Sequence, residues 1–337
     1  MTPSPSPQPA VRTVSIGGAT VDLFVRTGTG IACVKNDAIT FPLGAKIRIE
    51  QVIETCGGGA TNTAIGLRRL GCEAGFSGIV GSDQWGERIL QNLDREGVDS
   101  SAATIVENET SGFSIIMNVE CGERVILYAN GVNAHLHDVT FDRETVAGND
   151  WLYFNHIHDD SRVIQDDIVL MLRGNPKMGM TWNPGGRHLK RGMDHEDNVA
   201  LLKQTDLLLL NKEEALTFTH KQSPERAIEA LLKAGVSIVC VSDGPNGCMA
   251  SDGRTLYSCP AIQEAEILDT TGAGDAFGTG ATWARIRGLD LPIMLRAGTI
   301  NATSVLGTIG AQTGLLTDID MQKRLESTRL DVDERPL

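Results

Sequence analysis

The sequence predicts an α/β fold with a mostly parallel central sheet flanked by helices, together with a small separate β-sheet. From residue 151 onward, short apolar segments alternate with helical segments. Such short runs are typical of buried parallel strands covered by helices. Residues 24–55 and 108–130 instead contain alternating apolar and polar residues with few helix signals, as in AKIRIEQVIET. We therefore expect an α/β domain formed by residues 11–23, 56–107 and 131–325, and a small β-sheet formed by residues 24–55 and 108–130.

The N-terminal half contains a few clear elements. An apolar strand after residue 11 ends at Gly17 and Gly18, where the backbone can pass close to a ligand. We expect Asp83 to cap the helix that follows it. In chain order the expected elements are a strand over 11–17, a helix over 60–70, a strand over 75–80, a helix over 84–96 and a hairpin over 111–128 with its turn at ECGE.

The C-terminal half predicts a series of strand–helix units. We expect buried parallel strands at WLYFN, MGMTWN, DLLLLN, SIVCVSDG and AEILD, and a hairpin from CMAS to TLYS that turns at Asp252 and Gly253. Ligands bind outside the carboxyl ends of such strands, so the polar residues there mark a cleft. For two of them, Asn155 and Asn183, a turn or cap role is an open alternative. The expected helices span residues 161–174, 224–235 and 293–307, with a last helix and frayed end from Asp318, of which residues 326–337 form the C-terminal tail.

The most informative segment is DTTGAGDAFGTG, from Asp269 to Gly280. Gly272 and Gly274 flank Ala273, so three consecutive amides can turn inward at the start of a helix of small residues. A helix N-terminus carries roughly +0.5 of an elementary charge and binds anions such as a phosphoryl group. Asp275 lies in the first turn, where a carboxylate makes chemical sense if it accepts a proton from an attacking hydroxyl. We expect the helix terminus to keep Asp275 ionised and therefore a weak base.

Two motifs carry a family resemblance. DTTGAGD is similar to the C-terminal signature of the ribokinase-like (PfkB) family of carbohydrate and nucleoside kinases. Residues 58–64, followed by Gly71 and Gly81, resemble the N-terminal signature of the same family at its usual spacing. The resemblance implies a ribokinase-like fold in which the small β-sheet is a lid that closes over the substrate. A lid suits a kinase because water competes for the phosphoryl group.

The resemblance also implies a set of substrate-binding residues. Asp22 would bind substrate hydroxyls, although a turn-capping role is an alternative. Gly58 and Gly59 would let a sugar lie against the main chain. Asn62 is a further candidate ligand, and a hydrogen bond at the helix start is the alternative for it.

A second set is implied for ATP and its cations. Asn211 and Glu214 have the form of the family's NxxE motif, which would hold Mg²⁺ through water. Asp269 and the Thr271 carbonyl are candidates for a monovalent cation such as K⁺, and a structural role for Asp269 is left open. The expected nucleotide contacts are Asn211, Ser242, Gly244, Gly247, Thr271, Gly272, Gly274 and, beside the adenine, Asn301.

Composition excludes several classes of protein. The net charge of −13 disfavours nucleic acid or an anionic membrane as a partner. The seven cysteines are scattered, which indicates reduced thiols and a cytoplasmic protein. We expect residues 1–10 to be a disordered tail, and no apolar run reaches the roughly 18 residues of a membrane span. The chain has neither a GxxxxGK[ST] P-loop nor a GxGxxG fingerprint.

We therefore expect an ATP-dependent kinase that phosphorylates a small sugar or sugar acid, with Asp275 as the general base. A nucleoside is the alternative substrate, since GMTWNPGGR lacks the acidic residue more usual in sugar kinases. Nucleoside binding would need an apolar or aromatic slot, for which Phe24, Phe41 and Phe113 are available. A binding protein without catalysis is a further alternative. His156 and His158 are expected to contact substrate rather than metal. The edges of a small sheet favour a homodimer through the lid.

Overall fold

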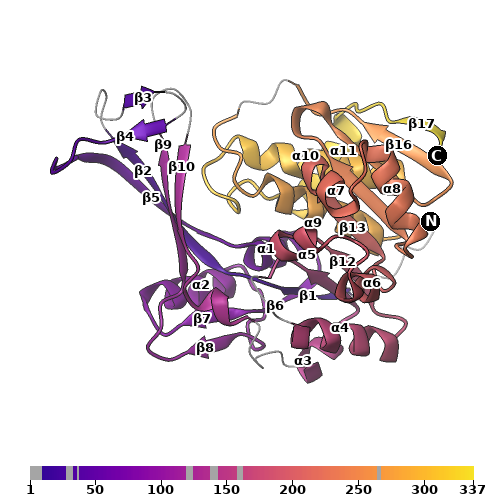
Figure 1. Cartoon of the computed structure of the whole chain (residues 1–337), viewed down its shortest axis with the longest axis horizontal. Helices are drawn as coiled ribbons and strands as arrows, with labels where there is room; N and C mark the ends of the chain where they lie inside the picture. Colours follow the sequence, from indigo (N-terminus) through magenta and orange to yellow (C-terminus); the bar gives the residue numbers. More distant parts are fainter. Residues whose placement is uncertain are drawn as a thin grey trace, which may run out of the picture.

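The computed structural model describes residues 10–27, 33–35, 38–118, 124–136, 143–157, 162–263 and 267–337. Within these ranges the chain folds into a large α/β domain and a thin sheet that extends away from it (Figure 1). This arrangement confirms the predicted fold class. The expected tail at residues 1–10 lies outside the described residues except for its last residue.

The large sheet has nine strands in the order β17-β16-β15-β14-β13-β12-β11-β1-β6. The six strands from β14 to β6 are parallel, and β15, β16 and β17 continue the sheet in antiparallel pairing. The parallel strands bring their carboxyl ends to one edge of the sheet, where the sequence analysis expected a cleft from the polar residues that end the strands. The bounds are β1 (Arg12–Ile16), β6 (Glu73–Ser77), β11 (Trp151–Phe154), β12 (Gly179–Trp182), β13 (Leu207–Asn211), β14 (Ile238–Ser242), β15 (Cys248–Ser251), β16 (Thr255–Cys259) and β17 (Asp333–Pro336).

Helices cover both faces of this sheet. Side chains alternate between the two faces along each strand, so apolar side chains on each face pack against helices. In β13, Leu208 and Leu210 pack with α4, α6, α7 and α8, whereas Leu207 and Leu209 pack with α9, α10 and α11. The bounds are α1 (Gly59–Arg69), α2 (Gln84–Arg95), α3 (Arg143–Ala147), α4 (Arg162–Gly174), α5 (Gly186–Arg191), α6 (Glu196–Leu202), α7 (Lys212–Thr219), α8 (Pro224–Lys233), α9 (Ala273–Ile286), α10 (Leu291–Leu306) and α11 (Asp318–Ser327), with 3-10 turns η1 (Gly131–His135) and η2 (Gly244–Asn246).

The lid is a four-stranded sheet in the order β10-β9-β2-β5. Its strands are β2 (Thr20–Thr27), β5 (Ile49–Gly57), β9 (Gly112–Asn118) and β10 (Arg124–Ala129). The predicted hairpin is confirmed by the antiparallel pairing of β9 with β10, and its turn lies outside the described residues. The lid begins at Thr20, earlier than the expected boundary at residue 24. Short pairs β3 (Cys33–Lys35) with β4 (Ala38–Thr40) and β7 (Ile79–Gly81) with β8 (Thr104–Val106) complete the strands.

Two sequence predictions are wrong. AEILD forms no strand over its described residues 267–269, where Ile267 and Leu268 are exposed. Strand β15 occupies the position beside β14 in the sheet. The AEILD segment instead lies at the end of α10, where the Leu268 N–H donates to the Leu306 carbonyl. The expected frayed C-terminus is an edge strand, β17, which pairs with β16 because backbone pairing tolerates its exposed charged side chains.

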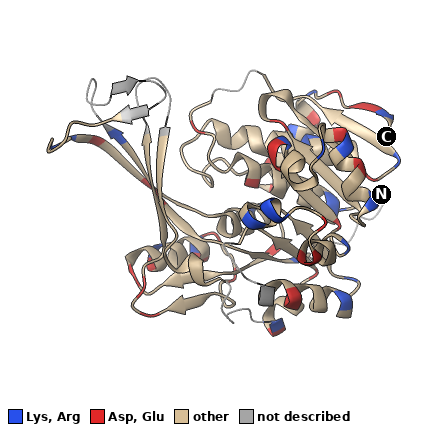
Figure 2. Cartoon of the chain, viewed as in Figure 1, with Lys and Arg blue, Asp and Glu red and all other residues tan. Residues whose placement is uncertain are grey.

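The remaining composition-based predictions concern thiols and charge. Five cysteines lie within the described side chains, and all five are free and buried. Acidic and basic residues are interspersed over the helices of the α/β domain (Figure 2). No helix of the described ranges has both the length and the apolar character needed to cross a bilayer.

The packing of α9 on the sheet generates a stability prediction. A Cβ at Gly278 would collide with the hydroxyl of Tyr153 in β11, and that buried hydroxyl has no hydrogen-bond partner in the described part of the chain. We expect Gly278→Ala to lower the free energy of unfolding by about 1–3 kcal/mol through overpacking. In a Tyr153→Phe background the loss should be smaller, since the colliding oxygen is gone. Urea denaturation of the four proteins checks this, and an equal loss in both backgrounds would contradict it.

Candidate active site

Two cavities meet at the start of α9. The first, here called the lid cavity, has a volume of about 320 Å³ and includes Thr271, Gly272 and Asp275 in its lining. The second, here called the apolar cavity, has a volume of about 380 Å³ and includes Thr270, Ala273 and Gly274. The first turn of α9 is therefore a thin wall with one cavity on each side.

Asp275 is held in the lid cavity by one side chain from α1. The Asn62 amide nitrogen donates to its Oδ2 over 2.8 Å. Burial raises the pKa of Asp275 to about 6, and the Asn62 hydrogen bond only partly opposes this. The expectation of a weak base is thus wrong, because desolvation of the carboxylate outweighs the helix terminus. Asp275 is ionised at neutral pH and has a pKa suited to accepting a proton.

The main chain at the start of α9 offers an anion site. Gly272 is the N-cap at φ 77°, and no side chain caps the helix. A Cβ at Gly274 would meet no atom within 4 Å, so the space beside its Cα is open. The predicted set of three amides is reduced by one, because the Ala273 N–H donates to the Thr270 carbonyl over 3.3 Å. The N–H groups of Gly272, Gly274 and Asp275 have no acceptor among the described residues, so Asp275 takes the place of Ala273 in the set.

Asp22 lies within strand β2 and lines the lid cavity, which rules out the turn-capping alternative. It is buried and accepts hydrogen bonds from the hydroxyls of Thr20 and Ser114. Burial raises the pKa of its carboxyl, and the negative charge of nearby Asp269 adds to this. A hydroxyl-bearing ligand would supply the donors that this carboxylate needs.

Gly58 and Gly59, which were expected to lie against a sugar, both line the lid cavity. Gly58 has φ 98°, and a Cβ there would come within 2.6 Å of the Gly18 carbonyl and the Ala19 Cα. Only glycine therefore allows α1 to start against the beginning of β2. Asn62 is not a helix-start cap, since its amide bridges Asp275 and Gln312.

The apolar cavity contains four of the predicted nucleotide contacts, of which Gly274 belongs to the first turn of α9. Ser242, Gly244 and Gly247 line one side of it, at the end of β14. The opposite wall comes from α9 and α10, where side chains alternate between apolar and hydroxyl groups. These residues, which the sequence reasoning missed, are Phe277, Thr299, Ala302, Thr303 and Leu306.

The prediction that Asn301 flanks the adenine is wrong. Asn301 is fully buried and lines neither cavity. Its amide nitrogen donates to the Ala276 carbonyl and the Thr279 hydroxyl, and its carbonyl accepts from the Leu316 N–H. Asn301 therefore joins α10 to α9, while its helix neighbours point into the cavity.

Asn211 and Glu214 form a capping box at the start of α7. The Asn211 side chain accepts from the Glu214 N–H over 2.9 Å, and Glu214 accepts from the Asn211 N–H over 2.8 Å. Burial raises the pKa of Glu214, as expected for a carboxylate short of partners. Asn211 pairs with Ser242 across β13 and β14, so both residues lie on the edge that borders the apolar cavity. The donor set fits a cation bound through water.

Asp269 has a structural role in this structure. Its Oδ1 accepts from the N–H and hydroxyl of Thr271, and its Oδ2 accepts from the Gly310 N–H over 3.0 Å. Its bonds therefore tie the segment before α9 to the loop that follows α10.

Groups of three or more His, Cys, Asp or Glu side chains suited to a metal are absent from the described ranges. His156 lines the lid cavity, whereas His158 lies outside the described residues.

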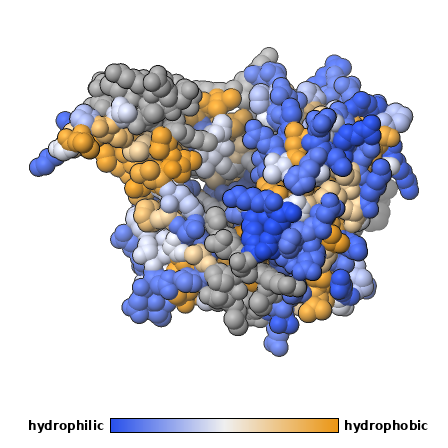
Figure 3. Space-filling model, viewed as in Figure 1, coloured by the Kyte–Doolittle hydropathy of each residue, from blue (hydrophilic) through white to orange (hydrophobic). Residues whose placement is uncertain are grey.

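The lid contributes residues that the sequence reasoning missed. Ile116, Ile126 and Tyr128 line the lid cavity on one face of the strands, and apolar side chains gather on the lid (Figure 3). Asn133 also lines it and exchanges two hydrogen bonds with the main chain of Ala19. The alternation of residues along the hairpin could have assigned each side chain to one of the two faces of the lid. It could not have shown which of these faces the α/β domain approaches. Asn155 and Asn183 line the cavity as well, and their amides bond Thr63 and the Leu209 carbonyl.

Comparisons with known proteins agree on one family. The profile of the pfkB family carbohydrate kinases matches residues 29–318. An uncharacterized sugar kinase of Archaeoglobus fulgidus is 28% identical over 266 residues, which cover 76% of this chain and all of the relative. A nucleoside kinase of Methanocaldococcus jannaschii is 25% identical over 314 residues, covering 89% and 98% of the two chains. The structure of Arabidopsis thaliana ribokinase complexed with ribose and ATP shares the fold, with a TM-score of 0.79, 21% identity and coverage of 94% and 99%.

Proposed function

The chain belongs to the pfkB family of carbohydrate kinases, and on this premise we propose that it transfers the γ-phosphoryl group of ATP to a hydroxyl of a small sugar, with Asp275 as the general base. Membership makes it a phosphotransferase with an alcohol acceptor. One observation carries the assignment: Asp275 and the open amides of α9 lie between two cavities of different character. A hydroxylated acceptor suits the lid cavity and an adenine suits the apolar one.

The proposed mechanism follows from the acceptor capacity of Asp275. The acceptor hydroxyl lies in the lid cavity and gives its proton to the Asp275 carboxylate as its oxygen attacks the γ-phosphorus of ATP. The bond from that phosphorus to the bridging oxygen of ADP breaks, and ADP leaves through the apolar cavity. The Gly274 and Asp275 N–H groups would stabilise the charge on the transferring phosphoryl group. Asn62 keeps the carboxylate aimed at the cavity.

The cations stay predictions. Asn211 and Glu214 would hold Mg²⁺ through water, and Ser242 and Gly244 would contact the nucleotide phosphates. Bound Mg²⁺ would neutralise charge on the phosphates and orient them. For K⁺, the Thr271 carbonyl remains a candidate, while the three hydrogen bonds of Asp269 favour its structural role.

Charge in the lid cavity favours a neutral sugar over a sugar acid or sugar phosphate. The lining contains the carboxylates of Asp22 and Asp275, and no lysine or arginine is among its described residues. The pKa of both carboxyls is raised by burial, and neither carries the lowering that a neighbouring cation would cause. An anionic acceptor would meet two negative charges, whereas a polyol offers donors to both.

A nucleoside is the second candidate, and one observation favours it. Ile116, Ile126 and Tyr128 give the lid cavity an apolar and aromatic wall of the kind that a base would stack on. This wall comes from the lid, and it differs from the Phe24, Phe41 and Phe113 slot expected from the sequence.

The exposed Ile126, Leu127 and Tyr128 of the edge strand β10 also support a homodimer through the lid, which stays a prediction.

Asp275→Asn tests the assignment of the base. We expect turnover to fall by roughly two to four orders of magnitude, because the amide cannot accept the proton, while ATP affinity is largely retained. The measurement is coupled ADP release with Mg²⁺ATP and K⁺ against pentoses, hexoses, sugar acids and nucleosides. Turnover like that of the wild type in Asp275→Asn would refute the assignment, and silence of the wild type with intact ATP binding would favour a binding protein without catalysis.

The pH dependence of kcat follows from the raised pKa of Asp275, which is about 6. Above that pH the carboxylate is ionised and can accept the proton, and below it the carboxyl is protonated and cannot. We expect kcat to be level at neutral pH and to fall roughly tenfold for each pH unit below about 6. A profile still level at pH 5, in protein shown to be folded there, would contradict the proposal.

Tyr128→Ala distinguishes the two substrate classes. Loss of a stacked base costs about 1–3 kcal/mol, so kcat/KM for a nucleoside should fall roughly tenfold or more. For a pentose or hexose, which offers C–H groups but no π-face for stacking, we expect a change of less than about threefold. Asp22→Asn is the control, because it removes a hydroxyl-binding charge and should weaken either substrate. A tenfold loss for the preferred sugar in Tyr128→Ala would show that the wall binds the sugar itself.

A further inference from the structure

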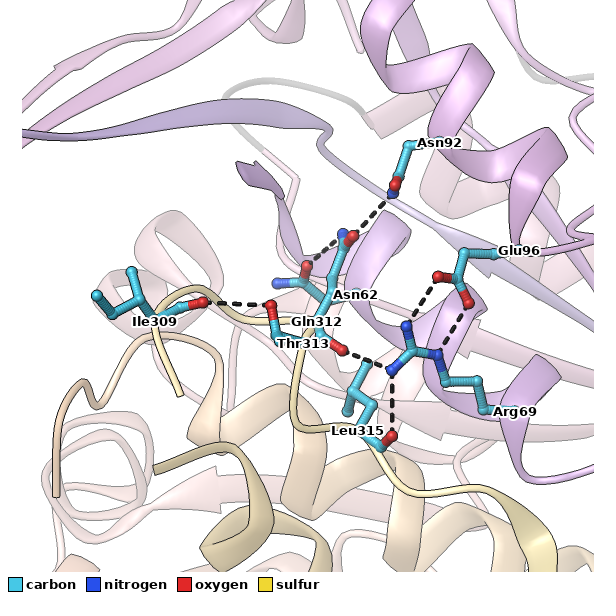
Figure 4. Close-up of polar contacts among 8 residues, drawn as sticks. All are labelled: Asn62, Arg69, Asn92, Glu96, Ile309, Gln312, Thr313 and Leu315. Atoms are coloured by element: carbon cyan, nitrogen blue, oxygen red, sulfur yellow. Dashed lines mark hydrogen bonds and ion pairs between the residues drawn. The ribbon is translucent and has the colours of Figure 1, made fainter. Parts of the chain in front are cut away.

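Asp275 is the end of a chain of amide side chains, of which the catalytic assignment uses only Asn62. The Asn62 amide donates to Asp275, the Gln312 Nε2 donates to the Asn62 Oδ1 over 2.9 Å, and the Asn92 Nδ2 donates to the Gln312 Oε1 over 2.8 Å. Figure 4 shows Asn62, Gln312 and Asn92 in line, coming from α1, the loop after α10, and α2. Asn62 and Gln312 are both buried.

The direction of every bond in this chain is set by Asp275. An ionised carboxylate can only accept, so Asn62 must present its NH₂ group to it. The oxygen of Asn62 then faces Gln312, which must donate in turn, and the oxygen of Gln312 faces Asn92. All three amides therefore point their donors toward the carboxylate, and bonds aligned in this way reinforce one another. Without Gln312, the Asn62 amide could turn over and present its oxygen to Asp275.

The main chain at Gln312 is fixed independently of its side chain. Arg69 forms a bidentate ion pair with Glu96, with both N–O distances 2.8 Å, and its Nη1 also donates to the carbonyls of Gln312 and Leu315 (Figure 4). Asn62 and Arg69 are seven residues apart on α1 and so share one face of the helix. One face of α1 thus binds both the backbone and the side chain of the same loop.

We propose that Gln312 and Asn92 are positioning residues, which hold the Asn62 amide in the one orientation that donates to Asp275 and so keep this carboxylate aimed into the lid cavity. The proposal rests on the proposed function, in which Asp275 is the base. Neither residue lines the cavities at the start of α9, so both act through Asn62 alone.

The test replaces the donor and measures the carboxyl directly. Gln312→Met keeps a long unbranched side chain but cannot donate to Asn62. We expect the titration midpoint of Asp275 to move upward by about one pH unit, because a fixed donor to the charged form is lost. In protein labelled with ¹³C-aspartate, NMR titration gives this midpoint, and the Asp275 signal is identified by its absence in Asp275→Asn. Turnover should fall roughly tenfold at pH 5 and little at pH 8, with the KM for ATP unchanged.

Two further variants separate positioning from simple packing. Thr313→Val alters the neighbouring side chain, whose hydroxyl bonds the Ile309 carbonyl, and should leave the Asp275 titration as in the wild type. Asn92→Leu removes only the outermost link and should give a smaller shift in the same direction. If Gln312→Met fails to fold, Asn92→Leu decides the question by the same criterion.

The outcomes are distinguishable from failure of the kinase assignment. An unchanged Asp275 titration in folded Gln312→Met overturns the positioning inference, even if the melting temperature falls. A wild-type protein without turnover overturns the proposed function, and the NMR titration then still tests how Asp275 is held. A shift in both Gln312→Met and Thr313→Val would mean that the loop acts only by its overall packing, and this too would overturn the inference.

Discussion

The architecture of the site depends on one constraint: a carboxylate must stay ionised where little water reaches it. Burial raises the pKa of Asp275, and only directed donors can offset the lost hydration. The Asn62 amide supplies one such donor from a different helix. Placing that helix requires Gly58 at its start, in a backbone conformation that side chains avoid. The N-terminal glycine motif and the C-terminal aspartate motif are therefore two parts of a single arrangement.

Continuity of the chain links the lid to this arrangement. Strand β5 of the lid ends at Gly57, and α1 begins at Gly59, so the lid leads directly into the helix that bears Asn62. At the far end of α1, Arg69 binds the loop of Gln312. The same loop donates to Asp269 through the Gly310 N–H, and a Cβ at Gly310 would collide with Thr55 of the lid. The lid, Asp275 and the start of α9 thus share one short loop as a common support.

Sequence reasoning reached the fold class and the local motifs because these depend on neighbours in the chain. The glycines at 272 and 274, the Asp83 cap and the alternation of strands and helices are local patterns. It failed where tertiary contacts decide. Nothing in AEILD indicates that β15 already occupies the sheet position next to β14. Asn301 is a polar residue on the helix that lines the apolar cavity, but it bonds the Ala276 carbonyl, and its neighbours Thr299 and Ala302 face the cavity instead. The contact of Asn62 with Asp275 spans 213 residues and has no local signal.

The wall between the two cavities has a consequence for how such a protein can diversify. Every described residue that lines the apolar cavity lies between Ser242 and Leu306, whereas the lid cavity draws mainly on residues between Gly18 and Asn183. Among the described residues, the linings of the two cavities come together at the first turn of α9. Mutations that reshape the lid can therefore accumulate while the apolar cavity stays intact, so the two cavities can evolve as separate modules. A lid taken from a relative with another acceptor would carry much of that preference with it.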